Sequence, residues 1–252
     1  DRHGYFSLGT NADYVASLVG RVPFFLEATT HMPRTRGANV VHHSQIAGWC
    51  ESDRPLVEVP RIEPREIDRQ IAAHVAERIT DGASVQIGIG SIPSAILDKL
   101  HDHRNLGIHT ELLHDGVVDL VEAGVVTGVE KEVRRNRVVA TFCLGTRHLY
   151  DWLDDNASVE MLGVDFVNDP RVIARMSKFV SVNATTEVDL LGQCASETIG
   201  GRYWSSSGGQ ADFARGAMYS EHGQAFLVTP STTRNGQSRI VPSLTPGSVV
   251  TT

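Results

Sequence analysis

The sequence predicts an α/β protein, an open, mostly parallel β-sheet with helices flanking it. Three observations support this fold class. After residue 66, strand-like runs alternate with segments of helical periodicity. The strand-like runs are short and mainly apolar, as expected for strands that are buried on both faces. Glycines mark several of the turns between them.

The first 60 residues contain aromatic and apolar clusters that predict short elements. Phe24–Ala28 is a predicted strand and Met32–Thr35 a predicted loop. The stretch Asp53–Pro64 carries three prolines within ten residues, and each proline removes a donor and fixes φ, so we predict an extended linker there. The domain boundary is therefore expected near residue 62, between residues 1–61 and residues 62–252.

Beyond this boundary the sequence predicts helices and strands in alternation. Apolar residues at helical spacing predict a helix over Ile67–Ile79, which stops at Asp81-Gly82. The next predicted elements are the strand Ser84–Ile87, the helix Ser94–Leu100, the strand Leu106–Ile108, the helix Val117–Ala123, the strand Arg137–Phe142 and the helix Leu149–Leu153. This repetition favours parallel strands that are connected through helices.

The pattern changes after Lys178. Phe179–Val182 and Glu187–Leu191 flank a short polar stretch and predict a β-hairpin. A glycine loop follows at Ser207–Phe213, and Ala225–Val228 is a further predicted strand.

Composition and charge argue against several functions. The net charge of −7 over 252 residues argues against non-specific nucleic-acid binding. No apolar run approaches the ~20 residues that a membrane span requires. Three widely spaced cysteines favour reduced thiols in a cytoplasmic protein over a disulfide framework. The pairs His42-His43 and His101-x-His103 lack a third ligand at useful spacing, so we expect no metal site.

Glu111 is the first candidate catalytic residue. It stands at the end of the predicted buried strand Leu106–Ile108, within the stretch Gly107-Ile108-His109-Thr110-Glu111. A carboxylate at such a place is costly unless solvent, a partner or chemistry explains it. Glu187 is a rival carboxylate, but it lies in the predicted hairpin.

A glycine turn, Gly88-Ile89-Gly90-Ser91-Ile92-Pro93, follows a predicted strand and precedes a predicted helix. In this context, backbone N–H groups and a helix N-terminus can meet a phosphate or a developing oxyanion. A dinucleotide-binding turn is the first alternative, although Pro93 stands where a third glycine would allow close packing. A tight turn without any ligand is the second.

Two further places allow close approach to a ligand. Gly208-Gly209-Gln210 could admit one because glycine has no Cβ, although an ordinary loop explains the composition equally well. Asn168 follows an apolar run and precedes Pro170, so by itself it is best interpreted as a cap of the next helix.

Taken together and in this order, these motifs closely resemble the acetyl-CoA hydrolase/transferase family, and the nearest branch contains 4-hydroxybutyrate CoA-transferase and butyryl-CoA:acetate CoA-transferase. The resemblance extends over almost the whole chain. The motifs that carry it are Met32–Thr35, Gly88–Pro93, Gly107–Glu111, Asp115–Val118, Val164–Pro170, Asn183 with Glu187–Asp189, Gly208–Phe213 and Ser238–Pro242. It implies a CoA-transferase-like sheet in which residues 1–61 end a preceding, similar domain. Residues 62–252 would form most of the domain that carries the catalytic glutamate, and we interpret the chain as a fragment.

The resemblance also implies a covalent ping-pong reaction. The family's glutamate aligns with Glu111, which would form a mixed anhydride and then a glutamyl-CoA thioester. Asn168 and the backbone N–H groups of Ile89 and Gly209 would stabilise the oxyanion. Gly208, Gln210 and the Gly88–Pro93 turn, including Gly88, Gly90, Ile92 and Pro93, would line the channel for the pantetheine arm of CoA. CoA would be a substrate, and no metal or redox cofactor would be required.

Three alternatives remain open from the sequence. Within the family, an acyl-CoA hydrolase would use water in place of the acceptor acid. From another class, the chain could be a non-catalytic CoA- or nucleotide-binding module. A dinucleotide-dependent oxidoreductase is the third, and Pro93 argues against it. A homo-oligomer is compatible with each of these alternatives.

Overall fold

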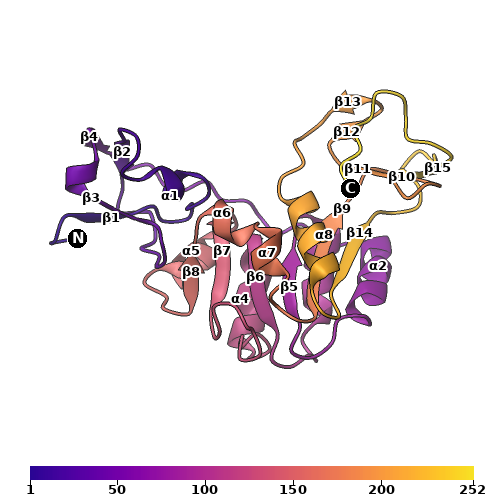
Figure 1. Cartoon of the computed structure of the whole chain (residues 1–252), viewed down its shortest axis with the longest axis horizontal. Coiled ribbons are helices and arrows are strands. Elements are labelled where there is room, and N and C mark those ends of the chain that lie inside the picture. The colour runs from indigo at the N-terminus through magenta and orange to yellow at the C-terminus, as the bar shows by residue number, and fades with distance from the viewer.

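A computed structural model describes residues 1–252, and a six-stranded, fully parallel sheet forms its centre (Figure 1). The strand order is β14-β9-β5-β6-β7-β8. The bounds are β5 Ser84–Ile87, β6 Gly107–Leu113, β7 Val138–Cys143, β8 Val159–Met161, β9 Phe179–Ala184 and β14 Gln224–Val228. The predicted fold class, an open parallel sheet with flanking helices, is therefore confirmed.

Helices cover both faces of this sheet (Figure 1). One face packs against α2 Glu66–Ala76, α3 Ser91–Lys99, α4 Asp115–Glu122 and α5 Arg147–Leu153. The other face packs against α6 Val164–Val167, α7 Pro170–Ile173 and α8 Gln210–Tyr219. Side chains alternate along each strand, so one set of strand residues enters the larger core and the next set enters the smaller core. None of the helices combines the length and apolarity needed to cross a membrane.

The N-terminal part contains short paired strands at one end of the molecule (Figure 1). Its elements are β1 Tyr5–Ser7, α1 Val15–Leu18, β2 Phe25–Ala28, β3 Val40–His42, the 3₁₀ turn His43–Gln45 and β4 Gly48–Glu51. β1 pairs with β3 and β2 with β4. Residues 52–65, where the prolines predict an extended linker, contain no helix or strand.

The C-terminal part adds small sheets beside the central one (Figure 1). β10 Glu187–Asp189 pairs with β11 Cys194–Ala195 and with β15 Ile240–Val241. β12 Thr198–Ile199 pairs with β13 Arg202–Tyr203. The three cysteines, Cys50, Cys143 and Cys194, are free thiols.

Two predictions of the sequence were wrong. Phe179–Val182 and Glu187–Leu191 do not form a hairpin, because β9 lies between β14 and β5 in the central sheet and β10 belongs to a separate sheet. The apolar run Phe179–Val182 is buried on both faces, as is typical of a central parallel strand. The strand predicted over Leu106–Ile108 is also longer, because it continues to Leu113 and therefore contains Glu111 instead of ending before it.

Candidate active site

Glu111 lies where β6 extends beyond its neighbour β5. The two strands pair only at Ser84–Gly107 and Val85–Ile108, and β5 then gives way to the glycine turn at residues 88–90. The second half of β6 therefore borders an opening in the sheet near its carboxyl edge, where ligands of open α/β sheets bind. Since side chains alternate, Glu111 shares the α6–α8 face of the sheet with His109.

The Glu111 carboxylate is half-buried and held by a backbone donor. Its Oε2 accepts a hydrogen bond from the Gly209 N–H at 2.9 Å. Burial raises the pKa of Glu111 above its ordinary value, whereas the Gly209 N–H and the Asn168 side chain favour the charged form. The charges of Asp13 and Asp212 add to the upward shift. Glu111 is therefore a desolvated but hydrogen-bonded carboxylate.

Gly209 is a place of close approach between three chain segments. A Cβ on this residue would lie 2.4 Å from Glu111 Oε2 and 2.5 Å from Asn168 Nδ2. A Cβ there would force one of these two side-chain ends to move, so glycine is what lets the backbone N–H reach the carboxylate in this geometry. The same distances place the amide nitrogen of Asn168 beside Glu111.

Asn168 is the residue that follows the last turn of α6, and its N–H donates to the Val164 carbonyl at 3.0 Å. Asp169 and not Asn168 caps the next helix, because the Asp169 side chain accepts a hydrogen bond from the Arg171 N–H. Asn168 is 7% exposed and its Oδ1 has no partner. Its side chain is thus free of a capping role and directed to the surroundings of Glu111.

The Gly88–Gly90 turn contributes two residues, Gly88 and Ile89, to a cleft that Glu111 also lines. Gly90, at φ +122°, is the N-cap of α3, and no hydrogen bond within the chain uses the Ile89 N–H. Gly88, Ile89, Glu111, Gly208, Gly209 and Gln210 line one open cleft of about 330 Å³. A residue with an unpaired backbone N–H and a carboxylate thus line the same cleft.

Gln86 and Asn183, from two neighbouring strands, line this cleft and belong to a network of polar side chains. Gln86 on β5 and Ser181 on β9 are paired in register, and the Ser181 hydroxyl donates to Gln86 Oε1 at 2.8 Å. Asn183 closes the network, since its Nδ2 donates to Gln86 Oε1 at 3.1 Å and its Oδ1 accepts from Gln86 Nε2 at 3.2 Å. The amides are therefore held in fixed orientations next to Gly88.

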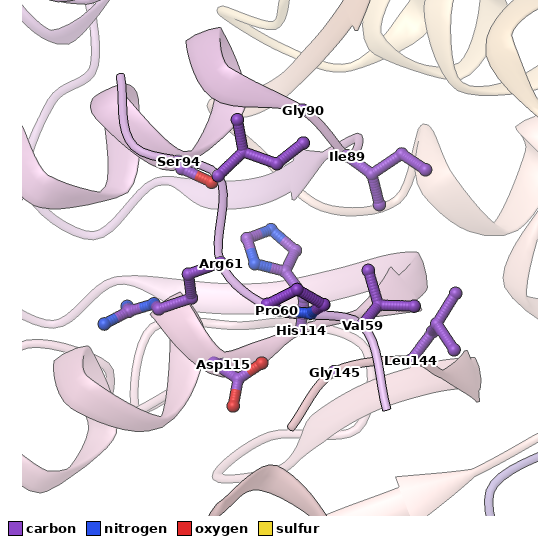
Figure 2. A pocket seen from close by; sticks show the side chains of 11 residues that line it. Val59, Pro60, Arg61, Ile89, Gly90, Ser94, His114, Asp115, Leu144 and Gly145 are labelled. Atoms are coloured by element: carbon purple, nitrogen blue, oxygen red, sulfur yellow. The ribbon is translucent and has the colours of Figure 1, made fainter. Parts of the chain in front are cut away.

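The remaining predicted residues lie outside the cleft. Gly90 lines a second, smaller cavity of about 140 Å³, on the far side of Ile89. Figure 2 shows that cavity with the linker residues Val59, Pro60 and Arg61 across it and His114 and Asp115 at its wall. Ile92 and Pro93 are buried in the first turn of α3, so they support the glycine turn from behind.

The rival carboxylate, Glu187, forms hydrogen bonds to a different segment of the chain. Its Oε1 accepts hydrogen bonds from the Thr245 N–H and the Ser248 hydroxyl, and its Oε2 accepts one from the Thr245 hydroxyl, each at 2.9 Å. These bonds hold the segment 245–248 against β10. Glu187 does not share the cleft with the glycine loops.

The sequence did not predict a role in the site for three residues that lie near Glu111. Asp13 comes from the N-terminal part, where the N–H groups of Ala12 and Asp13 donate to the Thr141 carbonyl of β7. Asp212 comes from α8. His109 is two residues before Glu111, and strand alternation alone could have placed it on the same face. The two aspartates had no such signal, because only the tertiary fold brings them near.

Comparison with known proteins gives consistent matches over the whole chain. A family model described as "Acetyl-CoA hydrolase/transferase C-terminal domain" matches residues 145–252. Succinyl-CoA:cyclohexane-1-carboxylate CoA transferase of Geobacter metallireducens is 42% identical over 100% of this chain and 58% of that protein. 4-Hydroxybutyrate coenzyme A transferase of Clostridium kluyveri is 41% identical over 100% of this chain and 59% of that protein. The chain thus spans somewhat more than half the length of these curated relatives.

Solved structures agree with these matches. RipA from Yersinia pestis superposes with a TM-score of 0.94 at 41% identity and covers 100% of this chain and 57% of RipA. A 4-hydroxybutyrate CoA-transferase from Porphyromonas gingivalis gives a TM-score of 0.87 at 35% identity and covers 97% of this chain and 59% of that protein. These similarities in sequence and fold, together with the matched domain, show that the chain belongs to the acetyl-CoA hydrolase/transferase family.

Proposed function

We propose that the protein to which this chain belongs is a CoA-transferase, which moves CoA from a short-chain acyl-CoA to a small carboxylate such as acetate or 4-hydroxybutyrate. Two relatives that are 42% and 41% identical to this chain are CoA-transferases by name. The observation that carries the proposal is the Glu111 carboxylate, which accepts a hydrogen bond from the Gly209 N–H and lines one cleft with Gly88 and Ile89. Glu111 is then the nucleophile of a ping-pong reaction.

The first half-reaction uses Glu111 twice. Its carboxylate attacks the thioester carbonyl, the C–S bond breaks, and an acyl-glutamyl anhydride and CoA thiolate result. The thiolate then attacks the glutamyl carbonyl of the anhydride and releases the donor's carboxylate. The product is a glutamyl-CoA thioester. A carboxylate suits this sequence because it can form both an anhydride and a thioester.

The second half-reaction reverses these steps with another acid. The acceptor carboxylate attacks the glutamyl-CoA thioester and expels CoA thiolate, which leaves an anhydride between Glu111 and the acceptor. The thiolate attacks the acceptor's acyl carbonyl and regenerates the Glu111 carboxylate. The balance of the reaction requires no oxidant, reductant or metal.

Each attack places negative charge on a carbonyl oxygen. The Ile89 N–H, which has no partner, and the Asn168 side-chain amide beside Glu111 are suited to donate hydrogen bonds to that oxygen. Gly209 N–H would hold Glu111 in the free enzyme and bind an oxyanion when the glutamyl carbonyl is attacked. Gly88, Gly208 and Gln210 would border the pantetheine arm in the cleft, while Gly90, Ile92 and Pro93 would support the turn.

The test is covalent trapping on the full-length protein. Acyl-CoA is added, the thioester is captured with hydroxylamine or borohydride, and the modified peptide is located by mass spectrometry. We expect the modification on Glu111 and its loss in Glu111→Gln. The matched control is Glu187→Gln, which should keep the modification on Glu111. An unmodified Glu111, together with an active Glu111→Ala variant, would end the assignment.

A second assay separates transfer from hydrolysis. Release of free CoA and formation of acetyl-CoA are both measured with and without added acetate. A transferase needs the acceptor for turnover, whereas a hydrolase releases CoA without it.

We also propose that the domain boundary lies at residues 61–62, within the irregular stretch 52–65. The three free cysteines support our proposal of a cytoplasmic location.

A further inference from the structure

A fully buried histidine lies directly beneath the candidate nucleophile. His109 is 0% exposed on β6, two residues before Glu111 on the same face of the sheet. Its ring is surrounded by Phe166, Phe179 and Phe213, with ring centroids 6.3–6.5 Å away. The reaction proposed above does not use this residue.

The hydrogen bonding of His109 defines its protonation. Its Nε2 is 2.8 Å from the carbonyl oxygen of Val167, and a carbonyl can only accept, so Nε2 carries the proton. Burial lowers the pKa of His109 to about 3, so the ring is neutral. Its Nδ1 therefore carries no proton and has no partner. A buried nitrogen without a hydrogen-bond partner destabilises the fold. An aromatic or aliphatic side chain would fill the same space without this cost.

The acceptor of this bond adjoins Asn168. Val167 is the last residue of α6, and Asn168 follows it. α6 has only four residues, too few to be stable by themselves, so contacts from outside determine where it lies. One of these contacts is the Val164 N–H to the Asp13 carbonyl at 3.0 Å, and His109 provides another. Of these two contacts, the one from His109 comes from the strand that carries Glu111.

We propose that His109 is a positioning residue, which fixes the Asn168 side chain relative to Glu111 through the Nε2–H to Val167 carbonyl hydrogen bond. Strand β6 then carries both Glu111 and the histidine whose hydrogen bond positions the Asn168 amide. The inference rests on the proposed function, since it concerns how that site is assembled. A shift of about 1 Å between reacting groups is enough to cost on the order of 10²-fold in rate.

The electrostatic surroundings make this role measurable. Asn168 favours the charged form of Glu111, so a displaced Asn168 lets the pKa of Glu111 rise further. The other charges that act on Glu111 are Asp13 from the N-terminal part and Asp212 from α8, and Lys131 acts on His109. None of these groups needs to change in the variants below.

The test compares three substitutions in the full-length protein. His109→Gln places an amide nitrogen at the distance of Nε2, His109→Asn is one methylene too short to reach Val167, and His109→Met has no donor. We expect His109→Met and His109→Asn to lose about 10- to 100-fold in kcat with KM for acyl-CoA changed less than about threefold. The acid limb of their pH–rate profiles should move to higher pH. His109→Gln should stay within about threefold of the wild type in kcat and keep its acid limb.

A double-mutant cycle shows whether His109 acts through Asn168. If it does, the double variant His109→Asn/Asn168→Ala should have nearly the same kcat as Asn168→Ala alone. The amide that His109 positions is already absent from Asn168→Ala. Equal kcat for the Gln and Asn variants at equal Tm, or an unmoved acid limb in His109→Asn, would overturn the inference. Because trapping on wild-type Glu111 is independent of these variants, failure of the inference and failure of the proposed function are distinguished.

Discussion

At the scale of single residues, the site depends on a balance at Glu111. Burial and two aspartates disfavour its charge, while the Gly209 N–H and Asn168 favour it. A buried carboxylate whose charge is only partly balanced by hydrogen bonds is reactive but lowers the stability of the fold. Active sites commonly show this trade-off between activity and stability. Gly209 makes the balance possible because no Cβ separates its N–H from the carboxylate.

The first residue-scale prediction concerns stability and pH. Because folding raises the pKa of Glu111, its titration contributes stability that is present below the ordinary value of 4.5 and is lost as pH rises through the folded value. Glu111→Gln should therefore be more stable than the wild type at pH 7.5, by about 0.5–1 kcal/mol since solvent still reaches the carboxylate. The gain should shrink at pH 4.5. Urea unfolding at the two pH values measures it, and a less stable variant at pH 7.5 would contradict the argument.

The second residue-scale prediction concerns Gly209. Gly209→Ala should reduce kcat by at least about 10²-fold, because its Cβ would displace Glu111 or Asn168. Its Tm should change little, since φ is −87° and suits any residue. The matched control is Gly208→Ala, whose Cβ stays 3.8 Å from Glu111 while φ is +53°. That variant should lose stability and keep more of its activity, and the reverse pattern would be evidence against a steric role.

At the scale of elements, β6 and β7 are joined by a buried lysine. Lys131 is 2% exposed, and its Nζ donates to the carbonyls of Ile108 in β6 and Arg137 just before β7, both at 2.7 Å. Burial lowers the pKa of Lys131 to about 7. These two hydrogen bonds of Lys131 fix the first residues of β6, the strand that carries Glu111. Lys131 itself does not line the cleft.

The element-scale prediction follows from this titration. A depressed lysine pKa means that stability is present above the unfolded value of about 10.5 and is lost as pH falls towards 7. Between pH 9 and pH 7 the wild type should lose about 1 kcal/mol per pH unit relative to Lys131→Met. Urea unfolding at pH 7, 8 and 9 tests this, with the exposed Lys99→Met as control. Parallel curves for wild type and Lys131→Met would show that Lys131 does not titrate in this range.

At the scale of the whole molecule, the linker is held across the carboxyl edge of the sheet. The Tyr150 hydroxyl donates to the Val57 carbonyl at 2.8 Å, and the Val59 N–H donates to the Gly145 carbonyl at 2.9 Å. Arg61 pairs with Asp119 on α4 at 2.6 Å. The segment between the N-terminal part and the sheet is thus irregular in backbone but fixed in place.

The whole-molecule prediction is that these anchors limit access of proteases to the linker. Tyr150→Phe removes the bond to Val57, worth about 1 kcal/mol, so cleavage by trypsin after Arg61 should be about fivefold faster. Tyr219→Phe, at an exposed tyrosine, is the control. Gel analysis of the digestion time course gives the rates, and equal rates for the two variants would show that Tyr150 does not anchor the linker.

The sequence by itself determined the fold class and the family, and it predicted the linker and Glu111 as the candidate nucleophile. Apolar runs and glycine turns are local signals, so strands such as Ser84–Ile87 were predicted with their observed bounds. The order of motifs identified the family and singled out Glu111. Local signals failed at β9, where a polar stretch resembled a hairpin turn, because pairing between distant strands decides which sheet a strand joins.

Only the tertiary structure decided how the site is assembled. Glu111, Asn168 and Gly209 lie far apart in the sequence, and their distances depend on how α6 and α8 pack on one face of the sheet. The contributions of Asp13, Asp212 and His109 have the same origin. Electrostatic and hydrogen-bonding effects act over a few ångströms in space, so they emerge only once the chain has brought these residues together.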